Sequence, residues 1–65
     1  MSVAKIIELT SESTEGFEDA VKQGLDKAGE TLHNIQGAWV DGQEVEIRDG
    51  QHRFRVHLKV TFVLD

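Results

Sequence analysis

The most constraining feature of this sequence is an unbroken alternation of apolar and polar residues near its C-terminal end. The apolar positions are Phe54, Val56, Leu58, Val60, Phe62 and Leu64, and the polar positions are Arg53, Arg55, His57, Lys59 and Thr61. Because successive side chains of a strand point to opposite faces of a sheet, the pattern predicts one long strand with an apolar and a charged face. At about 3.3 Å per residue, such a strand from residue 52 to 64 spans about 40 Å.

A strand and a helix are predicted before it. Residues 3–10 form a short run rich in β-branched residues, which favours a strand. Ser13 is the predicted N-cap of a helix that runs to about His33, with Asn34 as a left-handed stop. Apolar residues at spacings of three and four line one face of this helix: Phe17, Ala20, Val21, Leu25, Ala28 and Leu32.

From Ala38 the period changes to two, which predicts another strand. Val45 and Ile47 return to the inward face of Ala38 and Val40 only if one extra residue is inserted, so a β-bulge is expected around Gly42 and Gln43. The sequence RDGQ at 48–51 predicts a hairpin. We therefore expect an α+β fold, β-α-β-β, in one domain covering residues 1–65, with a three-stranded antiparallel sheet partly wrapped around one helix.

The helix is too short for this sheet. About 20 helical residues cover about 30 Å, so the sheet face that carries Trp39, Arg55 and His57 must meet water or another subunit. A chain of 65 residues without cysteine has neither disulfides nor thiolate zinc sites to supplement a small core. We therefore expect closed self-association.

Charge and composition exclude several classes of protein. The formal net charge of −5 argues against nucleic-acid binding, and no apolar run approaches 18 residues, which argues against a membrane span. We expect a cytoplasmic protein. No enzyme is expected either, because the serines suit N-terminal and capping positions, and the glycines are scattered rather than clustered before a helix. His33 fits a structural position at a helix C-terminus, and His52 fits a surface position after a turn.

Two features stand out from this background. The cationic row of Arg53, Arg55, His57 and Lys59 either holds an anionic group or neutralises acidic neighbours such as Glu44 and Glu46, and we favour neutralisation. Trp39 is the single tryptophan, and it is either an interface anchor or a stacking platform for a planar ligand.

Five segments carry a resemblance that covers essentially the whole chain. They are KIIELT, EDAV, TLHNI, DG and VHLKVTFVLD. In these segments and in the order of its elements the sequence resembles the dodecins, small flavin-associated proteins that build hollow shells of twelve subunits. The resemblance implies a homododecamer that binds or buffers a flavin, riboflavin or FMN, without catalysis.

The ligand positions of the family differ in this chain. The stacking tryptophan of the flavin-binding members aligns with Gly37, and their flavin-binding glutamine aligns with Arg55. A phosphate-binding arginine of some members falls opposite Glu44. Trp39 points to the same face as Gly37, about 6–7 Å along the strand, and either supplies a displaced platform or plugs the vacated cavity. The resemblance thus implies a ligand site lined by Gly37, Trp39 and Arg55.

A subgroup of the family that lacks the flavin tryptophan is associated with calcium. The acidic balance of this chain suits calcium or magnesium, and the candidate oxygen donors are Asp41, Glu44, Glu46 and Asp49. The second hypothesis is therefore a structural assembly that has lost flavin binding and binds such cations.

Overall fold

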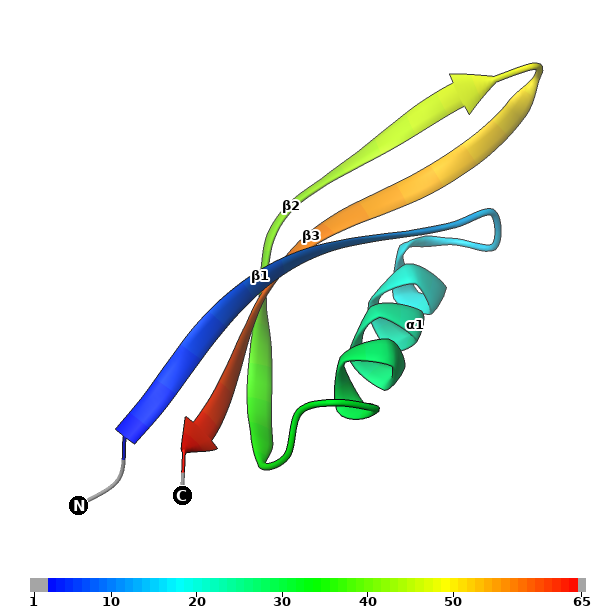
Figure 1. Cartoon of the computed structure of the whole chain (residues 1–65). Helices are drawn as coiled ribbons and strands as arrows, with labels where there is room; N and C mark the ends of the chain where they lie inside the picture. The colour runs from blue at the N-terminus through cyan, green and yellow to red at the C-terminus, as the bar shows by residue number, and fades with distance from the viewer. Residues whose placement is uncertain (1–2, 65) are drawn as a thin grey trace.

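The computed structural model describes residues 3–64 and has the predicted order of elements, β-α-β-β (Figure 1). The elements are β1 (Val3–Ser13), α1 (Phe17–Gly29), β2 (Ile35–Arg48) and β3 (Gln51–Leu64). They form one antiparallel sheet in the order β1-β3-β2, with β3 in the centre. The fold class is therefore confirmed. The ends of the predicted domain, Met1, Ser2 and Asp65, lie outside the described residues.

The core lies between β3 and α1, as the alternation predicts. Val56, Leu58 and Val60 of β3 are at most 1% exposed, and they pack with the fully buried Ala20 of α1. Burying such aliphatic side chains stabilises a fold by about 1.5–3 kcal/mol each. Partly buried apolar residues surround this core: Ile7, Leu9, Phe17, Val21, Leu25 and Ile35. Phe17 also packs edge-to-face on Phe54, with 5.2 Å between the ring centroids.

The predicted start of the helix is wrong. Ser13 is the last residue of β1, where it pairs with Phe54, and the N-cap of α1 is Gly16. The Ser13 hydroxyl accepts a hydrogen bond from the Glu15 N–H at 2.9 Å and donates one to Asp19 at 2.6 Å. Ser13 therefore shapes the turn before the helix, while pairing with the long central strand keeps its own backbone extended.

The predicted end of the helix is also wrong. Helix α1 ends at Gly29, and the N–H groups of Thr31 and Leu32 both bond to the Ala28 carbonyl in the turn that follows. His33 therefore lies beyond the helix and not at its C-terminus. Asn34 has the expected left-handed backbone, with φ of 60°, and it stands directly before β2.

The bulge and the hairpin agree with the sequence. The register of β2 on β3 shifts between Val40 and Gly42, next to the predicted bulge, and a second shift near Gly37 was not predicted. At the hairpin, Asp49 and Gly50 have φ of 52° and 75°. Two consecutive positive φ values are typical of the type I′ turn that matches the twist of paired strands.

Helix α1 packs on β1 and β3 and leaves β2 uncovered beyond Ile35, which is partly buried against the core (Figure 1). Three apolar residues of β2 lie opposite even-numbered residues of β3 and so share the helix side of the sheet: Val40, Val45 and Ile47. They are nevertheless 46%, 46% and 68% exposed. Their predicted direction is correct, but the helix does not reach them. The β2–β3 hairpin also extends past the helix, in agreement with the expected mismatch of lengths. Within residues 3–64, no helix has the length and apolar character that a membrane span requires.

The packing of α1 on β1 leads to a testable prediction about Gly24. A Cβ at Gly24 would lie 3.0 Å from the Ser11 Cβ and 3.1 Å from the Leu58 Cδ1. The substitution Gly24→Ala should therefore cost about 1–3 kcal/mol in strained packing, which the higher helix propensity of alanine offsets by about 1 kcal/mol, so the free energy of unfolding should fall by about 0–2 kcal/mol. The measurement is chemical denaturation.

Gly29 provides the matched control in the same helix. A Cβ at Gly29 meets no atom within 4 Å, so Gly29→Ala should leave stability unchanged or raise it by up to about 1 kcal/mol. If Gly24→Ala is as stable as Gly29→Ala, the close packing of α1 on the sheet is wrong.

Candidate functional site

The side of the sheet that faces away from α1, called the open face here, carries the polar half of the alternation. The residues of β3 on this face are Arg53, Arg55, His57, Lys59 and Thr61. Their partners on the flanking strands include Ile6 and Glu12 of β1, and Gly37, Trp39 and Glu44 of β2. Paired strands place opposite side chains on the same face, so Arg55, His57 and Lys59 each have a neighbour on both flanking strands, while Arg53 has a partner on β2 alone.

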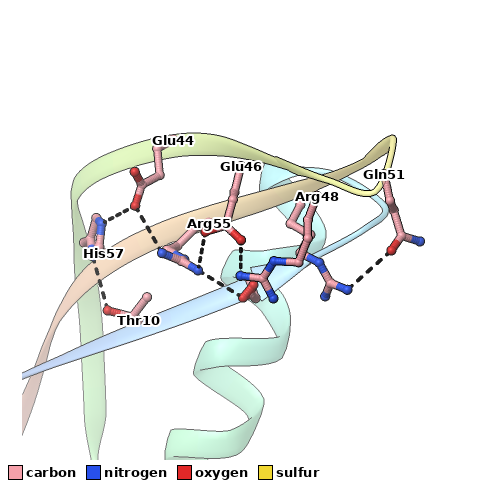
Figure 2. A network of polar contacts seen from close by, with 9 residues as sticks. Thr10, Glu44, Glu46, Arg48, Gln51, Arg55 and His57 are labelled. Atoms are coloured by element: carbon pink, nitrogen blue, oxygen red, sulfur yellow. Dashed lines mark hydrogen bonds and ion pairs between the residues drawn. The ribbon is translucent and has the colours of Figure 1, made fainter.

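Arg55 is held by three carboxylates from the two flanking strands. Its guanidinium lies 3.4 Å from Glu12 of β1, and 3.6 Å and 3.2 Å from Glu44 and Glu46 of β2. The hydrogen bond to Glu12 and the charges of Glu12 and Glu46 raise the pKa of Arg55 above its usual value. Arg48 also contacts Glu46 (Figure 2). The donors of Arg55 are therefore directed to the protein's own carboxylates.

The rest of the cationic row is paired less tightly. His57 bridges the two neighbouring strands, with Nε2 3.4 Å from Glu44 and Nδ1 3.2 Å from the Thr10 hydroxyl (Figure 2). Lys59 lies 3.8 Å from Asp41. The predicted neutralisation of the row by Glu44 and Glu46 is thus confirmed for Arg55, with Glu44 also next to His57, and Asp41 neutralises Lys59.

Trp39 is 71% exposed on the open face, beside a shallow hollow of about 320 Å³. The other side chains that line the hollow are Ile6, Asp41, Lys59 and Thr61. Gly37 is opposite Thr61, and a Cβ there would meet no atom within 4 Å. An indole next to a cation, a carboxylate and a hydroxyl offers both a stacking surface and hydrogen-bonding groups to a planar molecule.

The structure separates the three predicted ligand residues. Trp39 lines the hollow and Gly37 lies opposite Thr61, another of its lining residues, whereas Arg55 is four residues from Lys59 along β3, about 13 Å away. The polar groups at the hollow were missed as ligand residues, although Asp41 was considered for cations. If the strand register is counted from the hairpin through the bulge, Lys59 falls opposite Trp39. The sequence therefore contains the signal that identifies this lysine as a neighbour of the tryptophan.

The predicted cation donors do not form a site within one subunit. Among residues 3–64, no three histidine or acidic side chains gather closely enough to hold a metal ion. Asp41 is paired with Lys59, while Glu44 and Glu46 are paired with Arg55. Asp49 occupies the hairpin turn.

A larger hollow of about 670 Å³ runs between α1 and β1. Its lining combines Ile7, Leu9 and Leu32 with polar and charged side chains, and it includes no aromatic residue among those described. The ion pair at its edge, Lys27 to Glu30, is 84% and 60% exposed, so it gives little fixed polar geometry. The chemistry therefore favours the hollow beside Trp39 as the functional site.

Comparison with known proteins identifies the family and the fold. The family profile named Dodecin matches residues 3–65. No curated protein matches the chain. The dodecin from Streptomyces davaonensis is 31% identical, with a TM-score of 0.92 over 98% of this chain and 96% of that one. An arginine-to-alanine mutant of the Thermus thermophilus dodecin is 30% identical, with a TM-score of 0.93 over 100% and 97%.

A third similar structure is the calcium-chelating immunodominant antigen of Mycobacterium tuberculosis, a calcium dodecin with a novel calcium-binding site. It is 26% identical, with a TM-score of 0.90 over 98% of this chain and 93% of that one. The profile match spans nearly the whole sequence, and the β-α-β-β topology is shared. This chain therefore belongs to the dodecin family.

Proposed function

We propose that this chain is the single-domain subunit of a non-catalytic, cytoplasmic homododecamer that binds and sequesters a planar ligand of the flavin class. The ligand would lie on the open face, at sites shared between subunits. The observation that carries the proposal is Trp39, a tryptophan 71% exposed over a hollow on the sheet face opposite α1. Stacking of a planar ring on such a residue is worth about 1–3 kcal/mol.

The exposed apolar surface supports self-association. Ile6 and Trp39 on the open face, and Val40, Val45 and Ile47 on the helix side of β2, are all at least 46% exposed. Both outer strands of the sheet, β1 and β2, also keep one edge without a partner strand among the described residues. Neighbouring copies would bury this surface, and the family supplies the expected number of twelve.

A second candidate function is binding of calcium or magnesium. The similarity to the calcium dodecin and the net charge of −5 favour it. Because no three ligand side chains gather among residues 3–64, such a site would draw carboxylates from more than one subunit. Asp41 and Asp49, and the glutamates at 44 and 46, are the donors available on β2 and its turn.

The first prediction from the proposed function concerns assembly. Native mass spectrometry and sedimentation should give twelve times the mass of the chain. Ile47→Glu should reduce this mass, because it places a charge on the apolar side of β2, where Ile47 is 68% exposed. A stable monomer of the wild-type chain at micromolar concentration would contradict the proposal.

The second prediction concerns the ligand. Titration with riboflavin and FMN should quench flavin fluorescence, and Trp39→Ala should weaken binding by about 1–3 kcal/mol through the loss of stacking. Trp39→Phe keeps an aromatic face and should recover most of this loss.

Calcium titration of the same samples separates the two candidate functions. If calcium raises the melting temperature while riboflavin neither quenches nor stabilises, the cation-binding function replaces the flavin function.

The third prediction concerns Gly37 and Arg55, two of the three positions where this chain differs from flavin-binding members of the family. The double substitution Gly37→Trp and Arg55→Gln should increase riboflavin affinity at least tenfold, since space for a side chain exists at Gly37 and an amide both donates and accepts hydrogen bonds. Fluorescence titration measures the gain.

Arg55→Gln alone provides the control. It should lower thermal stability, because it removes the cation between Glu12, Glu44 and Glu46. Unchanged affinity in the folded double variant would show that these positions do not determine flavin binding.

A further inference from the structure

We infer that the ion pair of Asp41 and Lys59, and not Arg55, forms the hydrogen bonds to the ring of the bound ligand. The inference rests on the proposed function and specifies its ligand class. This class is a planar heteroaromatic ring with an imide edge, in which one N–H lies between two carbonyl groups. Isoalloxazine, the ring of flavins, is the member tested below.

The strand register places the ion pair beside the tryptophan. Lys59 is directly opposite Trp39, and Thr61 is opposite both Gly37 and Ile6. Asp41 is the extra residue of the bulge between Val40 and Gly42, and it lines the same hollow as Trp39. The bulge residue has no partner in the ladder, and its carboxylate lies 3.8 Å from the Lys59 ammonium.

The ion pair has hydrogen-bonding capacity to spare. Its charged groups are 3.8 Å apart, and the side chains of Lys59 and Asp41 are 43% and 47% exposed. An exposed ion pair of this kind contributes little to stability, so a ligand can replace part of it at low cost. Arg55 is different, because its side chain is only 27% exposed and its guanidinium faces three carboxylates.

The groups at the hollow complement an imide edge. The edge presents acceptor, donor and acceptor in sequence, so a protein needs donors for the carbonyls and an acceptor for the N–H. The Lys59 ammonium and the Thr61 hydroxyl are donors, and the ionised Asp41 carboxylate is an acceptor. A guanidinium has donors only, so Arg55 would leave the ring N–H without a partner.

The experiment compares riboflavin with N3-methylriboflavin, in which a methyl group replaces the hydrogen of the ring N–H. Fluorescence titration of the assembled wild-type protein should show at least a tenfold preference for riboflavin, since a hydrogen bond to a charged group is lost on methylation. Asp41→Ala should lower riboflavin affinity about tenfold and reduce the preference to near one. Lys59→Met, which keeps the aliphatic part of the side chain, should weaken the binding of both riboflavin and N3-methylriboflavin.

Glu8→Ala is the matched control. Glu8 is opposite Lys59 on β1, so it is an acidic neighbour of the same lysine, but it does not line the hollow beside Trp39. This variant should keep both the riboflavin affinity and the preference. Native mass spectrometry of every variant confirms that the assembly is intact.

The outcomes distinguish the inference from the proposed function. If the wild-type protein binds neither flavin, the proposed function fails and the inference fails with it. If it binds both flavins equally, or if Asp41→Ala keeps the wild-type preference, the inference is overturned while flavin-class binding stands. An equal effect of Glu8→Ala and Asp41→Ala on riboflavin affinity would also overturn it, because the change would then follow from the loss of one negative charge and not from a hydrogen bond to Asp41.

Discussion

The structure depends on the two faces of β3, which pairs along its length with both other strands. Its even-numbered side chains from Val56 to Val60 are desolvated against α1, while its odd-numbered side chains carry the cations of the open face. The apolar side supplies the main stabilisation, because exposed ion pairs contribute little. The charged side determines which groups of the open face are already paired and which are available to a ligand.

The lengths of the elements explain why a functional surface exists at all. Helix α1 has 13 residues, whereas β2 and β3 have 14 residues each in the more extended strand conformation. One helix of about 20 Å covers part of one sheet face, on β1 and β3, and no second layer covers the open face within residues 3–64. The exposed Trp39 and Ile47 lie on opposite sides of the uncovered strand β2. Under the proposed function, a ligand and neighbouring subunits bury these side chains.

The turn and the bulge, which depend on neighbouring residues in the sequence, were predictable. The effects of pairing between strands that are distant in the sequence were not. The Asp49-Gly50 turn and the bulge near Gly42 follow from residue type and periodicity, and together they determine the register that brings Lys59 to Trp39. Ser13 was misread as a helix cap because its hydroxyl accepts a nearby N–H in either conformation, and only pairing with Phe54 decides for the strand. The exposure of Val45 depends on the strand order β1-β3-β2, which places β2 outside the reach of the helix.

The residue at position 55 links the stability of the sheet to the choice of ligand. Glu12, Glu44 and Glu46 converge on it from both flanking strands, so a neutral side chain there would leave three carboxylates close together without a counter-charge. Arg55 and these glutamates therefore depend on one another, and the guanidinium is committed to the protein. Under the proposed function, ligand recognition on this face therefore involves the part of the row where pairing is loose. That part is Lys59 with Asp41, placed beside the tryptophan by the bulge in β2.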